Sequence, residues 1–582
     1  MRLFLTLLAL LTALSTEAQQ NFWSAAPTRA DLQEALQQRQ YSVDRYAAFQ
    51  LDLPAMQQAL RQAPSEQAAG EPPLQLMMPM PDGTFKAFQI VATPVMAPGL
   101  ASRYPAIKTY RGWNPEQPRE SIRLGYGPSK GFYATVFSAE GRAYIDAAGS
   151  RYISYYTHEN PNPQLRQAFY CDVDGGEGGL HDHPALESRS PVNTATLRTY
   201  RLAMACTGEY AQYHGGTVAS ALEAMVIKVN RLNQVFERDL AIRVELIENN
   251  DELIFLDGDT DGLSNGVTDE LLGQIGPIIN STIGLPNYDL GHVLNVHGDA
   301  PGNGVASLNS LCTVSKANGV SGITQPEGDP FVIDIIAHEI GHQFGATHTM
   351  NSCQNVNAAT AFEPGSGSTI MAYAGICSPM NNLTTSTDDH YHTGSLEQIL
   401  DYTRQGNGDG CAAKTPTDNT APTVDIPLRN GFFIPISTPF ELTASATDPD
   451  EDALTYCWEQ YDLGPVNTGL GNPQGNSPLF RSYSPVPNPT RVFPRINKVI
   501  SNNFDDSEIL PDYGRDLTFR CTVRDNNPAA GNAVWEEVKF QADENAGPFR
   551  VQVPNTDTVI WEVGSYEEIN WDVANTDNDS VR

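Results

Sequence analysis

The chain has 582 residues, of which 40% are hydrophobic and 18% charged, so it can build folded cores, and a wholly disordered chain is excluded. Sixty-nine acidic residues against 36 basic ones give a formal net charge of -33, which repels phosphate backbones and argues against a nucleic-acid partner. The length predicts about two to four domains.

The first 18 residues have the pattern of a secretory signal peptide. Met1-Arg2 supplies a positive start, residues 3–14 are almost wholly apolar, and Thr16-Glu17-Ala18 offers a small-residue cleavage site. This run is too short to span a bilayer, and no later run approaches about 18 apolar residues. We therefore expect a secreted, extracellular protein without a transmembrane anchor, in which disulfides can form.

Residues 19–195 predict a mixed, mostly β domain. Gly131–Phe137 and Tyr152–Tyr156 alternate like half-buried strands. The Gly-rich run at residues 175–179 and the polar stretch after it predict an exposed junction.

Strand and helix patterns alternate over residues 196–412. Strand patterns occupy residues 200–207, 241–247, 291–296 and 305–308, whereas the apolar spacing over residues 218–236 is helical. This alternation predicts an α/β sandwich.

The remaining sequence predicts only β structure. Residues 413–422 are rich in Pro, Thr and Asp, which is typical of a linker. Alternating stretches without an evident helix predict an immunoglobulin-like β-sandwich over residues 423–545. Residues 546–582 look like the start of a further β domain that the end of the sequence truncates.

The strongest motif is His-Glu-x-x-His-x-x-Gly-x-x-His at residues 338–348. From the composition, its chance expectation in a chain of this length is on the order of 10⁻⁵. Asp329 is a suitable N-cap for a helix through His338 and His342, which lie four residues apart and therefore project from one helical face. Gly345 can adopt the left-handed conformation that ends the helix and brings His348 round as a third ligand.

Three neutral imidazoles leave a fourth zinc position open for water, as a catalytic zinc site requires. Glu339 lies beside the metal as the general base that takes a proton from that water. The alternative is a structural zinc site, which would need a fourth protein ligand and would not need Glu339. The pattern favours the catalytic interpretation.

Further stretches resemble a known family. Residues 369–373 (TIMAY) are similar to the Met-turn of the metzincin metallopeptidases. Residues 291–306, Cys312 and residues 344–349 resemble the reprolysin (adamalysin) branch, and the likeness is nearest to secreted bacterial reprolysin-like peptidases. The resemblance covers about residues 199–411. It implies an α/β metzincin catalytic domain with a twisted, mostly parallel sheet and an active-site helix, after an α+β or mostly β propeptide and before C-terminal β-sandwich modules.

The resemblance also implies roles for individual residues. Met371 would lie beneath the zinc ligands. Tyr373 would be a zinc ligand or an oxyanion stabiliser, or else a buried aromatic residue of the turn. The strand containing Gly304, Val305 and Ala306 would bind an extended substrate as an edge strand.

The eight cysteines suggest a disulfide pattern. The resemblance implies the pairs Cys312–Cys411 and Cys353–Cys377. Cys457 and Cys521 lie on two predicted strands, where an inter-sheet disulfide is expected.

Cys171 is the candidate zymogen switch, because a thiolate in the fourth position would exclude the catalytic water. Reprolysin propeptides use such a cysteine. A Cys171–Cys206 disulfide is the alternative that pairs all eight cysteines, and Asp172 or Asp174 could cap the metal instead.

Calcium sites are also candidates. Asp257, Asp259 and Asp261 have the alternation of a calcium loop, but an EF-hand needs Glu where Thr268 stands, so a solvated acidic turn is the alternative. Residues 448–452 offer a similar choice. The remaining histidines, His390 and His392 among them, are expected to be surface or hydrogen-bonded residues.

Together these features predict a secreted zinc-dependent endopeptidase, made as a zymogen, that hydrolyses peptide bonds in proteins. The alternative is a surface adhesion or binding protein whose sandwich modules contact a cell surface or a polymer. The complete motif favours the peptidase, because decayed peptidases usually lose the Glu or a His.

Overall fold

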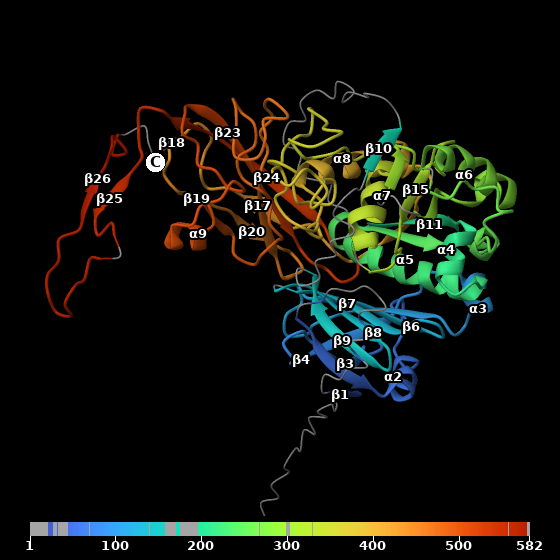
Figure 1. The fold of residues 1–582 in the computed structure, drawn as a ribbon. Coiled ribbons are helices and arrows are strands. Elements are labelled where there is room, and N and C mark those ends of the chain that lie inside the picture. Colours follow the sequence, from blue (N-terminus) through green and yellow to red (C-terminus); the bar gives the residue numbers. More distant parts are fainter. Residues whose placement is uncertain are drawn as a thin grey trace, which may run out of the picture.

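The computed structural model describes residues 21–26, 32, 36, 43, 45–68, 70–138, 140–157, 170–174, 196–266, 268–297, 303–328, 330–556 and 558–578. Figure 1 shows an N-terminal region in blue and cyan, a central region in green and yellow, and a C-terminal region in orange and red. The predicted signal peptide lies outside the described residues. Within those residues, no helix has both the length and the apolar character to cross a membrane.

The N-terminal region is built on one antiparallel sheet. Its nine described strands pair in the order β1-β2-β9-β8-β7-β6-β5-β4-β3, over an apolar core that includes Met56, Leu76, Phe88 and Ile122. The predicted strands at residues 131–137 and 152–156 are confirmed as β7 and β9. The elements are β1 (Trp23–Ala25), β2 (Ala47–Leu51), α2 (Leu53–Leu60), β3 (Leu74–Pro79), β4 (Phe85–Ala92), α3 (Pro98–Arg103), β5 (Lys108–Trp113), β6 (Ser121–Gly127), β7 (Gly131–Ser138), β8 (Gly141–Ala148) and β9 (Arg151–Tyr156).

The central region contains the predicted mostly parallel sheet. Its described strands run in the order β10-β14-β15-β13-β11-β12, and β16 pairs with β11. Only the β14–β15 and β11–β16 pairs are antiparallel. The strands are β10 (Tyr170–Asp174), β11 (Thr196–Cys206), β12 (Ile242–Leu246), β13 (Leu290–Val296), β14 (Asn303–Ser307), β15 (Gly319–Ile323) and β16 (Ala413–Pro416).

Helices flank this sheet. They are α4 (Gly208–Tyr213), α5 (Val218–Leu240), α6 (Thr268–Thr282), a π-helical stretch η4 (Pro330–Ala337), α7 (His338–Gln343) and α8 (Thr393–Arg404), with short 3₁₀ turns at Asn250–Leu253, Leu285–Asn287 and Asn407–Asp409. The prediction of a plain linker from residue 413 is wrong for its first residues, because β16 extends the central sheet. Its side chains are exposed, which explains why its composition resembles a linker.

Helix α5 lies between the central sheet and the N-terminal sheet. Its start is fixed by Thr217 and Ser220, which form a capping box. The side facing the N-terminal sheet carries polar residues, and these are paired: Arg231 with Asp146 at 3.0 Å, and Glu237 with Arg123. Buried charges in an interface are costly, and pairing of this kind offsets that cost.

The C-terminal region has a separate apolar core, which includes Ile434, Trp458, Phe493 and Phe519. Its described strands form a four-stranded sheet (β18-β24-β23-β21) and three strand pairs (β17–β20, β19–β22 and β25–β26). The elements are β17 (Thr423–Asp425), β18 (Phe433–Pro435), β19 (Phe440–Thr443), β20 (Ser445–Thr447), β21 (Thr455–Gln460), β22 (Thr490–Phe493), α9 (Ile496–Ser501), β23 (Arg515–Arg524), β24 (Ala533–Asp543), β25 (Arg550–Val553) and β26 (Asn570–Asp572). The short helix α9 corrects the expectation of strands alone.

The predicted Cys457–Cys521 disulfide is wrong, because both residues are buried thiols. They lie on neighbouring strands of one sheet, where Cys457 is opposite Thr522 and Cys521 is opposite Trp458. This offset of one residue sends the two sulfurs to opposite faces of the sheet.

The C-terminal region is joined to the central region by ion pairs, one of which is fully buried. Arg524 Nε lies 2.9 Å from Asp239 Oδ1, and neither side chain is exposed. Arg520 pairs with Glu397 of α8 at 2.7 Å.

Candidate metal centre

The first two motif histidines lie on α7. The sequence predicts one regular helix through residues 330–344, but the structure has a π-helical stretch up to Ala337 and an α-helix only from His338. Two turns of apolar residues do not distinguish i+4 from i+5 hydrogen bonding. The predicted N-cap Asp329 lies outside the described residues.

The third histidine is brought back by the predicted turn at Gly345, whose φ is +105°. A side chain there would also collide with Asn309, because a Cβ would lie 2.6 Å from Asn309 Oδ1. The turn places His348 Nε2 3.1 Å from His342 Nε2, and His338 Nε2 lies at the same distance from His342 Nε2.

Backbone carbonyls orient all three rings. The Nδ1 atoms of His338, His342 and His348 lie 2.7, 2.7 and 2.8 Å from the carbonyl oxygens of Ile370, Ala346 and Asn355. A carbonyl oxygen only accepts, so each Nδ1 carries the proton and each Nε2 lone pair faces the shared centre. Burial lowers the pKa of His338 to about 3 and that of His348 to about 4, so the imidazoles are neutral, the form that binds metals.

A thiol completes the group. Cys171 Sγ lies 3.5 Å from His342 Nε2 and 3.7 Å from His348 Nε2, and all four side chains are buried and could hold one metal ion. Tetrahedral zinc with bonds of about 2.05 Å to nitrogen and about 2.3 Å to sulfur separates N from N by about 3.3 Å and N from S by about 3.6 Å. The donor types and their spacing therefore fit zinc.

Glu339 lies beside this group. Its carboxylate is fully buried, and neither oxygen has a hydrogen-bond partner among the described residues. A Cβ on Gly304 of β14 would lie 1.9 Å from Glu339 Oε1, so only glycine allows the strand to approach this carboxylate. A buried carboxylate without a partner costs stability unless a further group satisfies it, which also suits a site built for a metal and its water.

Met371 and Tyr373 lie next to the histidines. Met371 is buried against α7, where a Cβ on Gly341 would lie 2.5 Å from its sulfur. The Tyr373 ring centroid lies 4.8 Å from that of His348, and its hydroxyl donates to the carbonyl oxygen of Cys171 at 2.9 Å.

A family model described as metallo-peptidase family M12B, reprolysin-like, matches residues 196–403. Residues 196–403 are a reprolysin-like metallopeptidase domain. The protein is thus a metalloendopeptidase, a hydrolase of peptide bonds with protein substrates, and zinc is the metal of this family. No curated protein matches the chain.

The predicted substrate edge of the reprolysin-like domain is covered. Strand β14, which contains Gly304, Val305 and Ala306, pairs with β15 on one side and with β10 on the other. Strand β10 runs parallel to β14 with Cys171 opposite Gly304. Figure 1 shows β10 beside β15 and α7, apart from strands β1–β9 of the same N-terminal region. Local pattern could not reveal this pairing.

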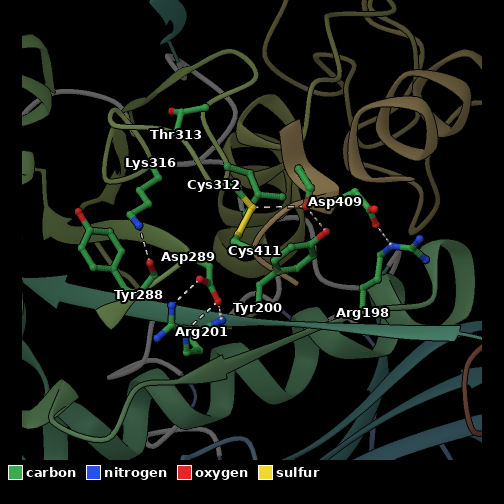
Figure 2. The surroundings of a disulfide bond; sticks show 12 residues. Arg198, Tyr200, Arg201, Tyr288, Asp289, Cys312, Thr313, Lys316, Asp409 and Cys411 are labelled. Atoms are coloured by element: carbon green, nitrogen blue, oxygen red, sulfur yellow. Dashed lines mark hydrogen bonds and ion pairs between the residues drawn. A yellow bond between two sulfur atoms is a disulfide. The ribbon is translucent and has the colours of Figure 1, made fainter. Parts of the chain in front are cut away.

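Two predicted disulfides of the central region are confirmed, Cys312–Cys411 and Cys353–Cys377. Figure 2 shows the first, beside the Arg201–Asp289 pair (2.7 Å) and the Arg198–Asp409 pair (3.1 Å). The alternative Cys171–Cys206 disulfide is not formed, because Cys206 is a buried thiol.

The predicted calcium loop is a capped turn in the structure. Asp257 accepts the backbone N–H of Asp259 at 3.1 Å, and Asp261 accepts those of Leu263 and Gly208 at 2.8 Å. Oxygens of Asp448, Asp452 and Asp525 do gather within 4.8 Å of one another. Calcium at either place stays a prediction.

Proposed function

We propose that this protein is a secreted zinc endopeptidase made as an inactive precursor. The observation that carries the proposal is the convergence of Cys171 with His338, His342 and His348. Three ligands come from the reprolysin-like domain and the fourth from the preceding region, so one segment both completes and blocks the site.

In the active form, His338, His342 and His348 would hold the zinc through Nε2. Zinc, when bound, polarises a peptide carbonyl and acidifies a water molecule. Glu339 takes the proton of the attacking water on its carboxylate and then delivers it to the leaving amine. Burial raises the pKa of Glu339, which suits a group that takes up a proton, and the donor that opposes this rise is the Cys171 thiol, which would leave with β10. Tyr373 is the candidate oxyanion stabiliser, once its hydroxyl is released from the Cys171 carbonyl.

Latency would follow from β10. The thiolate of Cys171 takes the fourth ligand position, and the strand occupies the edge of β14 where an extended substrate would pair. Activation would then require cleavage between β10 and the catalytic domain. The sequence offers two candidate bonds after arginine, Arg189–Ser190 and Arg198–Thr199. The bond after Arg198 lies inside β11, which is paired on both sides, so it is a poor candidate. The candidate bond Arg189–Ser190 lies outside the described residues.

Glu339→Gln tests the catalytic role. In the processed protein, we expect kcat/KM on a peptide substrate to fall by about 10²- to 10⁴-fold, with zinc content unchanged. Glu270→Gln on the exposed first turn of α6 is the matched control and should keep full activity. Full activity of Glu339→Gln would contradict the mechanism. A processed wild-type protein that binds zinc but cleaves no peptide would favour the adhesion alternative instead.

A further inference from the structure

We infer that Glu459, Ser482 and His390 form a positioning relay through which the C-terminal region holds His338 in its metal-binding orientation. The inference rests on the proposed function, because it concerns the same metal site. All three residues are buried, and two of them, Glu459 on β21 and Ser482, lie outside the reprolysin-like domain.

The relay begins at the carboxylate of Glu459. Its Oε2 accepts the backbone N–H of Thr393 at 2.9 Å, which fixes it to the start of α8. Its Oε1 accepts the hydroxyl of Ser482 at 2.7 Å. Because that hydroxyl donates to Glu459, its oxygen is left to accept from His390 Nε2 at 3.0 Å.

The relay continues through the backbone of one residue, Ile370, to the metal centre. The carbonyl oxygen of His390 accepts the backbone N–H of Ile370 at 3.1 Å. The carbonyl oxygen of Ile370 is the group that accepts from His338 Nδ1 at 2.7 Å. The position of Ile370, which comes directly before Met371, therefore sets the direction of the His338 lone pair.

A second contact holds the same segment. Asp388 pairs with Arg481 at 2.8 Å, and the backbone N–H of Asp388 donates to the carbonyl of Ser368 at 2.7 Å. The C-terminal region thus contacts residues 388–390 at both ends, and these residues are hydrogen-bonded to residues 368–370.

The geometry favours a relay over a second metal site. His390, Cys457 and Glu459 carry donor atoms that could hold an ion. However, His390 Nε2 lies 4.0 Å from Cys457 Sγ and 3.7 Å from Glu459 Oε1. Two donor atoms on one tetrahedral zinc ion would be closer together, at about 3.6 Å for N and S and about 3.3 Å for N and O. The Ser482 hydroxyl instead bridges His390 and Glu459 with two good hydrogen bonds.

The test is Ser482→Ala in the full chain, with zinc affinity measured by competition with a chelator. Loss of the hydroxyl leaves His390 Nε2 and Glu459 Oε1 without their bridge, so residues 388–390 and Ile370 should shift. We expect the affinity for zinc to fall about threefold to tenfold, which is less than the fall caused by removing a residue that contacts a metal ligand directly. The visible spectrum of the cobalt-substituted chain should also change. Ser477→Ala is the matched control, since Ser477 is a buried serine of the same region whose hydrogen bonds within the described part of the chain go to nearby Gln474. It should lower the melting temperature without changing zinc affinity.

Glu459→Gln is the second variant, in case Ser482→Ala does not fold, and it should weaken zinc in the same way. Unchanged zinc affinity and cobalt spectrum in whichever of the two variants folds would overturn the relay alone. Binding of two zinc ions by the wild-type chain, with one lost in Cys457→Ala, would also overturn it, in favour of a second metal site. A wild-type chain that binds no zinc would overturn the proposed function and the relay together.

Discussion

Replacing Cys171 by alanine separates the two ways in which we propose that β10 blocks the reprolysin-like domain. The substitution removes the sulfur that lies 3.5 Å from His342 Nε2. It leaves the parallel pairing of β10 with β14 intact. It also leaves the carbonyl oxygen of residue 171, which accepts from Tyr373 and from the side-chain amide of Asn355.

The remaining contacts set the expected size of the effect. Two hydrogen bonds to the carbonyl of residue 171, at about 1 kcal/mol each, still favour the covered site by about 2 kcal/mol, which is about 30-fold. Substrate binding is reduced by the fraction of chains that are open. The intact Cys171→Ala precursor should therefore reach about 3% of the activity of the processed enzyme, and the wild-type precursor less, because its thiolate must also leave.

The assay is cleavage of a quenched fluorescent peptide by the intact precursor, with mass spectrometry to show that no processing has occurred and with zinc content measured in parallel. Cys206→Ala is the matched control, because it removes another buried thiol of the central sheet, one that is not part of the group of metal-binding side chains. It should remain as silent as the wild type. If Cys171→Ala retains its zinc and is equally silent, the thiol is not the switch. Activity equal to that of the processed enzyme would show that the strand pairing contributes nothing.

Three further changes test other parts of the structure. Gly304→Ala should lower kcat/KM of the processed enzyme by about 100-fold, because the Cβ of the alanine would displace Glu339. Unchanged kinetics would refute the close contact between position 304 and Glu339. Asp239→Asn should lower the free energy of urea unfolding by about 3–5 kcal/mol, since it leaves buried Arg524 without its carboxylate. Arg524→Leu should lower it less, because Asp239 keeps its pair with Arg238. A larger loss for Arg524→Leu than for Asp239→Asn would contradict this reasoning. Burial lowers the pKa of Lys228 from 10.5 to about 7. Between these two pH values the unfolded chain therefore binds one more proton than the folded chain. The free energy of unfolding should rise with pH in this range by up to about 1.4 kcal/mol per pH unit. Lys228→Met should reduce this slope in unfolding measurements at pH 7 and 9, and an unchanged slope would count against it.

The convergence of the three motif histidines could be predicted from the sequence because its geometry is local. Helical spacing alone brings His338 and His342 to one face, and one glycine with positive φ returns His348. The alternating strands β7, β9, β11 and β13 were predictable for the same reason. Helix α6 was not, because Pro277 interrupts its pattern. Strand β15 was missed because it is short, contains two glycines and is buried on both faces.

Features that depend on pairing over long distances were not predictable. Strand β14 has the local pattern of an edge strand, and only the structure shows that β10, more than a hundred residues earlier in the chain, covers it. The Cys457–Cys521 prediction failed for a related reason. Alternation identifies two strands but not their register, and a shift of one residue exchanges the faces of the sheet.

Composition places a domain boundary near residue 412, but side-chain contacts cross that boundary. Asp239, Glu397 and His390 belong to the reprolysin-like match, yet their partners Arg524, Arg520 and Ser482 lie beyond it. A domain cut at that boundary would remove the arginine partners of Asp239 and Glu397 and leave both carboxylates to be solvated by water. The same cut would remove the support of Ile370, whose carbonyl orients His338. The C-terminal region is therefore connected to the metal centre by specific contacts. Its four-stranded sheet is part of the scaffold that supports the site.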